Sequence, residues 1–233
     1  MRTQTPREFT KEMADELIDR IIAKHSNDED FSRDDITSIE LPEGFEIIAD
    51  HAFEQMFGLE TVIIPEGYLA VGMFSFASDV NLRKVELPST LQVIFEGAFL
   101  GCCRLKSVEF PDGLISIGER AFMSCASLRK LDIPGSVLVV HEDAFYKCRN
   151  VRKLRLHEGT EVIEFRAFGD LFKLWHFNYK KKLPSTLGPE SRHSTAFVGS
   201  TCRRKFWREP IFKLRRYFGF EHRHRPYYYG VRY

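Results

Sequence analysis

The sequence predicts an α/β repeat solenoid: an array of short parallel strands with an α-helix covering its N-terminal end. Three observations predict it. Apolar residues recur every 23 positions, the recurring segments alternate apolar and polar residues, and an amphipathic stretch precedes the first repeat. Periods of about 20 to 50 residues are typical of arrays in which each unit buries its apolar face against its neighbours. The 233 residues suffice for one such array with short flanks.

Residues 1–35 are expected to form a helical cap and an acidic connector. Thr5 is suited to be the N-cap, Pro6 to occupy the first helical position and Glu8 to complete a capping box. We expect the helix to cover the open edge of the first coil, and an amphipathic helix that binds a partner is the alternative. Apolar residues follow at helical spacing: Phe9, Met13, Leu17, Ile18, Ile21 and Ile22.

Residues 36–173 contain six repeats of 23 residues. Each repeat opens with an L-x-x-V-x-L pattern, whose alternation predicts a strand. Proline follows in five of the six, and proline ends a strand because it has no N–H to donate. An Ala-Phe or Ser-Phe pair then predicts a short helical or turn segment with an inward phenylalanine in every coil. The pairs end at Phe53, Phe76, Phe99, Phe122, Phe145 and Phe168.

The pattern L-x-x-V-x-[LI]-P-x-G, followed by I-G and A-F-x-x-C, resembles the BspA-type leucine-rich repeat family. The stretch LKSVEFPDGLISIGERAFMSCAS, residues 105–127, fits almost column by column. The resemblance implies a right-handed leucine-rich-repeat array that binds other macromolecules and has no catalytic activity, and it implies no particular partner. It is clear over 36–173 and weaker over 174–202, which we interpret as a degenerate seventh repeat.

Composition favours an intracellular protein with free thiols, cytoplasmic or nuclear. The first residues contain no apolar run typical of a signal peptide, and nowhere do about 18 consecutive apolar residues occur. The five cysteines are odd in number. The net charge of +1 is uneven: residues 203–233 contain ten Lys/Arg and two Glu, giving +8, which leaves 24 basic and 31 acidic residues, or −7, for residues 1–202.

The cysteine spacing is compatible with a ligand site or with packing in the core. Cys102, Cys125 and Cys148 stand 23 residues apart, with Cys202 near the matching place, so stacked thiols would suit a metal or a disulfide. Met56 and Leu171 share that column and favour packing instead. Cys103 is expected to be more accessible. The histidines lack ligand spacing, and no phosphate loop or nucleophile–base pair occurs. We therefore expect no catalytic residue, cofactor or metal.

Charged residues occupy the outward strand positions in columns. Arg83, Lys106, Arg129 and Arg152 form one column, Lys84, Lys130 and Lys153 the next, and Glu86, Glu109 and Asp132 a third that turns to Arg155. Neighbouring columns of opposite sign favour a surface salt-bridge ladder. The alternative is a face that binds a complementary protein, with an unpaired basic end. Its candidate residues are Arg129, Lys130, Arg152, Lys153, Arg155, Trp175 and His176.

The tail, residues 203–233, interleaves ten aromatic residues with its ten basic ones. Three interpretations stay open: it caps the last coil, binds a polyanion such as nucleic acid, or lies on an anionic membrane. The polyanion interpretation rests on Arg203, Arg204, Lys205, Lys213, Arg215 and Arg216. We expect a scaffold for protein–protein interaction, with a nucleic-acid- or membrane-associated protein as the alternative.

Overall fold

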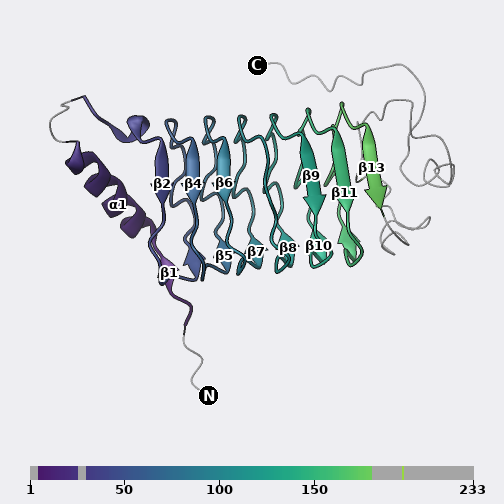
Figure 1. Ribbon diagram of the computed structural model, residues 1–233, viewed down its shortest axis with the longest axis horizontal. Coiled ribbons are helices and arrows are strands. Elements are labelled where there is room, and N and C mark those ends of the chain that lie inside the picture. The colour runs from purple at the N-terminus through teal and green to yellow at the C-terminus, as the bar shows by residue number, and fades with distance from the viewer. Residues whose placement is uncertain (1–4, 26–29, 180–195, 197–233) are drawn as a thin grey trace.

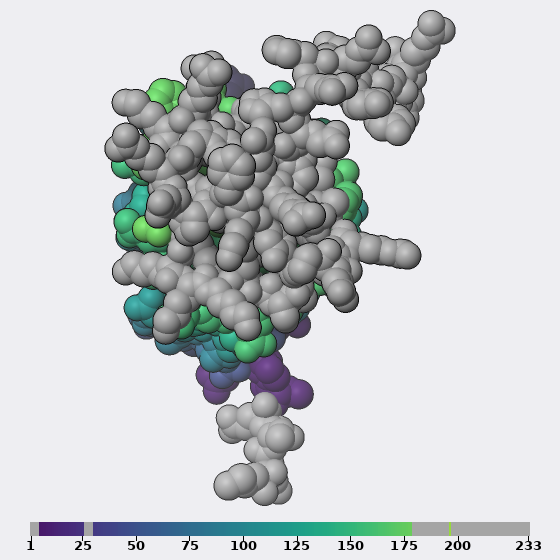
Figure 2. All heavy atoms as spheres, turned by 90° about the vertical axis from the view of Figure 1, so that its right-hand side faces the viewer, coloured from purple at the N-terminus to yellow at the C-terminus, as the bar shows by residue number. Residues whose placement is uncertain are grey.

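The computed structural model describes residues 5–25, 30–179 and 196, and these form one solenoid. Successive coils are stacked along a single long axis, with strands on two levels and the helix at the N-terminal end (Figure 1). Seen along that axis, the coloured atoms of early and late coils lie one behind another (Figure 2). The parallel-stranded solenoid predicted from the 23-residue period is therefore confirmed.

Most coils contribute two strands, and every pairing between the described coils is parallel. The predicted L-x-x-V-x-L strands form two three-stranded sheets: β2 (Ser38–Glu40), β4 (Thr61–Ile63) and β6 (Lys84–Glu86), then β9 (Lys130–Ile133), β11 (Lys153–Leu156) and β13 (His176–Tyr179). A second strand of two residues was not predicted. These short strands form a seven-stranded sheet of β1 (Glu8–Phe9), β3 (Ile47–Ile48), β5 (Ala70–Val71), β7 (Val93–Ile94), β8 (Ser116–Ile117), β10 (Val139–Val140) and β12 (Val162–Ile163).

The fourth coil lacks the strand that its sequence predicts. Where this strand is missing, the backbone hydrogen bonds to the two neighbouring coils are long, 3.4 Å from the N of Lys106 to the O of Arg83 and 3.4 Å from the N of Arg129 to the O of Lys106. The next coil is bonded at 2.8 Å, from the N of Arg152 to the O of Arg129. Phe110 replaces the usual Leu or Ile here, and its ring packs edge-on against Phe122. The larger Phe110 side chain thus occurs in the same coil as the break in the hydrogen-bond ladder between strands.

The core is built around the column of six phenylalanines predicted above. All six rings are buried, and each lies nearly parallel to the next, at centroid distances of 5.1 to 5.5 Å. The Ala-Phe segments that carry them are turns rather than helices. A single coil could not exclude water from its ring, so the stack forms only when coils associate.

The turns of the Ala-Phe segments need a left-handed residue before and after the pair. The first of these positions is occupied by His51, Phe74, Gly97, Arg120, Asp143 and Arg166, all with φ between 50° and 59°. Only glycine adopts this region without steric cost. The coils therefore contain repeated backbone strain that stacking offsets.

The N-terminal helix α1 (Lys11–Lys24) begins later than predicted. Thr10, rather than Thr5, is the N-cap, and its side chain accepts a hydrogen bond from the N–H of Met13. Glu8 and Phe9 instead form β1, because Phe9 extends the aromatic column and stacks at 6.0 Å on Phe53. Ala14 and Ile18 are buried against the first coil, as expected of a cap. Among the residues described, no helix has the length and apolar character needed to span a membrane.

Candidate interaction surface

The outward side chains of β2, β4, β6, β9, β11 and β13 form the strand face of the solenoid. In its N-terminal half the cations are paired with carboxylates, either of the same column or of another. Arg83 binds Glu60 of the preceding coil at 3.1 Å. Lys84 binds Glu86 within its own strand. Exposed pairs of this kind contribute little to stability, and they neutralise both Arg83 and Lys84 in this half of the face.

Asp132, at the centre of the C-terminal half, contacts three basic side chains. It binds Lys130 at 2.9 Å, His157 at 2.8 Å and Arg155 at 3.4 Å. Burial alone would raise the pKa of Asp132, but the hydrogen bonds from Lys130 and His157 outweigh it, so its pKa lies below the usual value. Arg155 was expected to belong to an unpaired basic end. That expectation is wrong, because the longer reach of arginine brings it to the carboxylate one coil away.

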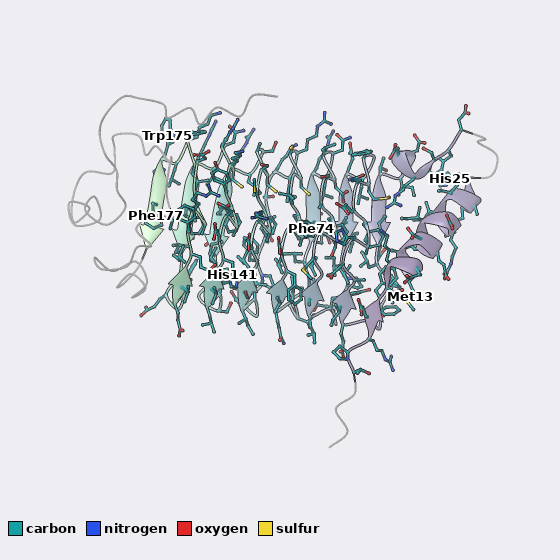
Figure 3. All side chains as sticks on the ribbon, turned by 180° about the vertical axis from the view of Figure 1, so that it is seen from behind. Met13, His25, Phe74, His141, Trp175 and Phe177 are labelled. Atoms are coloured by element: carbon teal, nitrogen blue, oxygen red, sulfur yellow. The ribbon has the colours of Figure 1, made fainter. Side chains whose placement is uncertain are left out.

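Four exposed cations on this face have no ion-pair partner within the described ranges: Lys106, Arg129, Arg152 and Lys153. We call them the basic strip. Lys106, Arg129 and Arg152 occupy one column on successive coils, and Trp175 continues it with a side chain that is 49% exposed. Nitrogen-tipped side chains gather along the rim near Trp175 (Figure 3). His176 is exposed beside it but is engaged in another interaction.

A hollow of about 390 Å³ lies on the same face where the fourth coil lacks its strand. Ser107 stands there in the column that holds Lys84, Lys130 and Lys153 in other coils. Carboxylates of Glu109 and Asp112 and the cations around Asp132 all line it. Because both signs of charge are present, the hollow selects neither an anion nor a cation.

The cysteine column is buried, as predicted. The thiols of Cys102, Cys125 and Cys148 donate to the carbonyls of Phe76, Phe99 and Phe122 at 3.1 to 3.2 Å. Burial raises the pKa of each thiol. Cys103 is exposed, also as predicted. Across the described ranges, no group of three His, Cys, Asp or Glu side chains is placed to hold a metal ion. Cys202 lies outside the residues described.

Asp79 occupies the cysteine column between Met56 and Cys102, and its burial was not predicted from the sequence. Its side chain is fully buried, and Oδ1 accepts a hydrogen bond from the Met56 N–H at 2.8 Å. Oδ2 has no partner among the described atoms. Burial raises the pKa of Asp79 to about 8, although the Met56 bond acts against the rise. The signal in the sequence was a carboxylate at an otherwise apolar or thiol position.

A second missed feature lies on the opposite side of the coils, where Figure 3 shows Phe74. Three coils further on, the buried Asp143 receives a bond of 2.7 Å from Nε of Arg166 and a second from its Nη2. The Arg166 guanidinium also lies 4.7 Å from the Tyr146 ring centroid. A bidentate, partly covered pair is a stronger contact than the strand-face pairs. It is structural, since both charges are satisfied within the fold.

The proposed polyanion residues fall outside the description. Arg203, Arg204, Lys205, Lys213, Arg215 and Arg216 all belong to the range 197–233, which the structure does not describe. The three interpretations of the tail are therefore untested, and the strand face is the candidate surface that the geometry supports.

Comparison with known proteins agrees with this architecture. No curated protein matches the chain. The crystal structure of the leucine-rich repeat protein of T. pallidum is similar, with 28% identity, a TM-score of 0.55, and coverage of 64% of this chain and 70% of that one. The pneumococcal vaccine antigen PcpA shares the fold at 18% identity and a TM-score of 0.54, over 72% of this chain and 42% of that one.

A family model supplies the assignment. The BspA-type leucine-rich repeat region matches residues 24–78 and 69–189, with six copies of the repeat. The matched ranges include every coil described above and account for well over half of the sequence. The chain belongs to the BspA-type leucine-rich repeat family.

Proposed function

We propose that this protein is a non-catalytic scaffold that binds a protein partner through its strand face. The observation that supports the proposal is the basic strip. Elsewhere on the face, cations are paired with carboxylates of the same or a neighbouring coil, whereas these four have no such partner among the residues described. Unpaired, aligned charge on a rigid surface steers a complementary partner and contributes to the rate and specificity of association.

The exposed Trp175 supports the same proposal. Tryptophan and arginine are the residues most enriched where interface energy concentrates. Trp175 lies next to Arg152 in the stack, since the backbone N–H of Trp175 donates to the Arg152 carbonyl at 2.9 Å. An exposed apolar ring beside unpaired guanidinium groups is the composition expected of a protein interface.

Affinity capture with matched variants tests the proposal. The strip variant carries Arg129→Gln and Arg152→Gln. The back-face variant carries Arg120→Gln and Lys147→Gln, which remove two charges from the side of the coils that includes Phe74. We expect the wild type and the back-face variant to capture the same partner and the strip variant to lose it. Capture of the same proteins by all three would contradict the proposal.

A further inference from the structure

The basic strip has a regular geometry that restricts the shape of its partner. Hydrogen bonds between backbones connect Lys106 to Arg129, Arg129 to Arg152 and Arg152 to Trp175, so each residue stands one coil beyond the last. The coils repeat at 5.1 to 5.5 Å along the aromatic column. Paired strands on the strand face itself are about 4.8 Å apart. The strip is thus a row of cations with a step of about 5 Å, parallel to the long axis.

An α-helix matches this step and an extended segment does not. One helical turn rises about 5.4 Å, so side chains at alternating intervals of four and three residues recur on one side at nearly the coil spacing. Side chains on one side of an extended strand recur about every 6.6 Å. Over three coils, the side chains of an extended segment therefore move several ångströms away from the cations that they would have to contact. Lysine and arginine side chains can accommodate the smaller mismatch of the helix.

The ends of the row fix the register of such a helix. At the C-terminal end, Trp175 offers an exposed apolar surface instead of a charge. At the other end, Arg83 is already neutralised by Glu60, whose carboxylate repels another acid. Acidic residues are therefore matched only opposite Lys106, Arg129 and Arg152, with Lys153 beside the last of them. The complementary helix has about four turns and ends in an apolar residue at Trp175.

We propose that the strand face binds an amphipathic α-helix of the protein partner, laid along the solenoid axis, with a stripe of acidic side chains on the basic strip and an apolar residue against Trp175. This inference rests on the proposed function and adds the chemistry of the partner to it. Nucleic acid and anionic membrane, which would also meet positive charge, are alternative outcomes of the test below.

Binding of synthetic peptides to the full chain tests the inference. The striped peptide is a stapled helix with glutamates at alternating intervals of four and three residues and a leucine one turn beyond. One control has the same staple and composition with its glutamates spread around the helix, and a second carries prolines that keep it extended. By fluorescence anisotropy we expect the striped peptide to bind at least about ten-fold more tightly than either control.

The protein variants supply the complementary controls. The strip variant should weaken binding of the striped peptide about ten-fold, Trp175→Ala several-fold, and the back-face variant not at all. Equal binding of all three peptides, or no binding, would overturn the inference. So would tighter binding of a single-stranded oligonucleotide or of phosphatidylserine vesicles. If no peptide binds but the strip variant still loses the partner in affinity capture, the helical partner is wrong and the proposed function stands. If the strip variant also captures the partner normally, both the helical partner and the proposed function are wrong.

Discussion

Replacing Asp79 with asparagine should stabilise the protein, and the gain should depend on pH. The carboxyl is fully buried, and burial raises its pKa from the ordinary 3.8 to about 8. Between these two values the folded state holds a proton that the unfolded state has released. The contribution of Asp79 to stability is therefore greatest at acid pH and falls as the pH rises to about 8, above which it is constant.

The magnitude follows from the shift. Each pKa unit corresponds to about 1.4 kcal/mol, so at pH 7 burial of this carboxyl costs roughly 4 kcal/mol relative to pH 3.8. Asparagine avoids that cost because it has no proton to gain. It also keeps the acceptor for the Met56 N–H. The cysteines of this column each donate to a carbonyl 26 residues earlier, so the Asn amide is expected to donate to the Phe53 carbonyl.

Urea unfolding of the wild type and Asp79→Asn, followed by circular dichroism from pH 5 to pH 9, measures the effect. The difference between the two free energies of unfolding should grow by about 1.4 kcal/mol per pH unit up to pH 8 and then level off. Asp50→Asn is the control, because the exposed Asp50 makes the same kind of bond, to the Met73 N–H, where solvent reaches it. A constant difference between wild type and variant, or a variant less stable at pH 8, would mean that Asp79 does not hold a proton in the folded state.

Three further predictions concern the thiols, the turns and the buried ion pair. Cys103 should react with a thiol reagent in the native state much faster than Cys125 or Cys148, whose pKa values burial raises; peptide mapping by mass spectrometry after brief labelling checks this, and rapid labelling of the buried pair would count against the packing column. Ser124→Gly should stabilise the protein by about 0.5–1 kcal/mol, because Ser124 has a φ of 64° and Gly101 fills the same position one coil earlier; a lower thermal midpoint would contradict it. Arg166→Met should destabilise by roughly 3 kcal/mol, since it leaves the buried Asp143 carboxylate uncompensated, and adding Asp143→Asn should restore part of the loss in urea unfolding; no restoration would mean that the charge is not the cause.

The predictable part of this fold is the part that repeats. Phe122 and Leu128 have counterparts in every full coil, so their burial follows from periodicity alone. The start of α1 was predicted wrongly because Thr5 and Thr10 both suit an N-cap, and the choice depends on the contact of Phe9 with Phe53. Such a contact is tertiary and has no local signature.

The missed features of the candidate surface have the same origin. Ion pairing on the strand face depends on side-chain reach across coils: Arg155 meets Asp132, whereas Arg129 meets no carboxylate among the residues described. Arg129 stands in a basic column and Arg155 ends an acidic one, and neither column shows which carboxylate a side chain reaches. Asp79 is the one carboxylate in a column that otherwise holds Met, Cys and Leu. The repeat pattern predicts the usual residue type at a position, so it does not predict how one exceptional residue behaves there.

We expect different columns of the repeat to stabilise the solenoid and to bind its partner. Unfolding Phe122→Ala and Arg129→Ala side by side in urea tests this most directly. Phe122 stacks between Phe99 and Phe145 at 5.1 and 5.4 Å, so its truncation should cost about 3–5 kcal/mol. Arg129 is exposed and makes no ion pair with any described residue, so its loss should change stability by less than about 0.5 kcal/mol. Small and equal effects at the two positions would contradict this division between the columns.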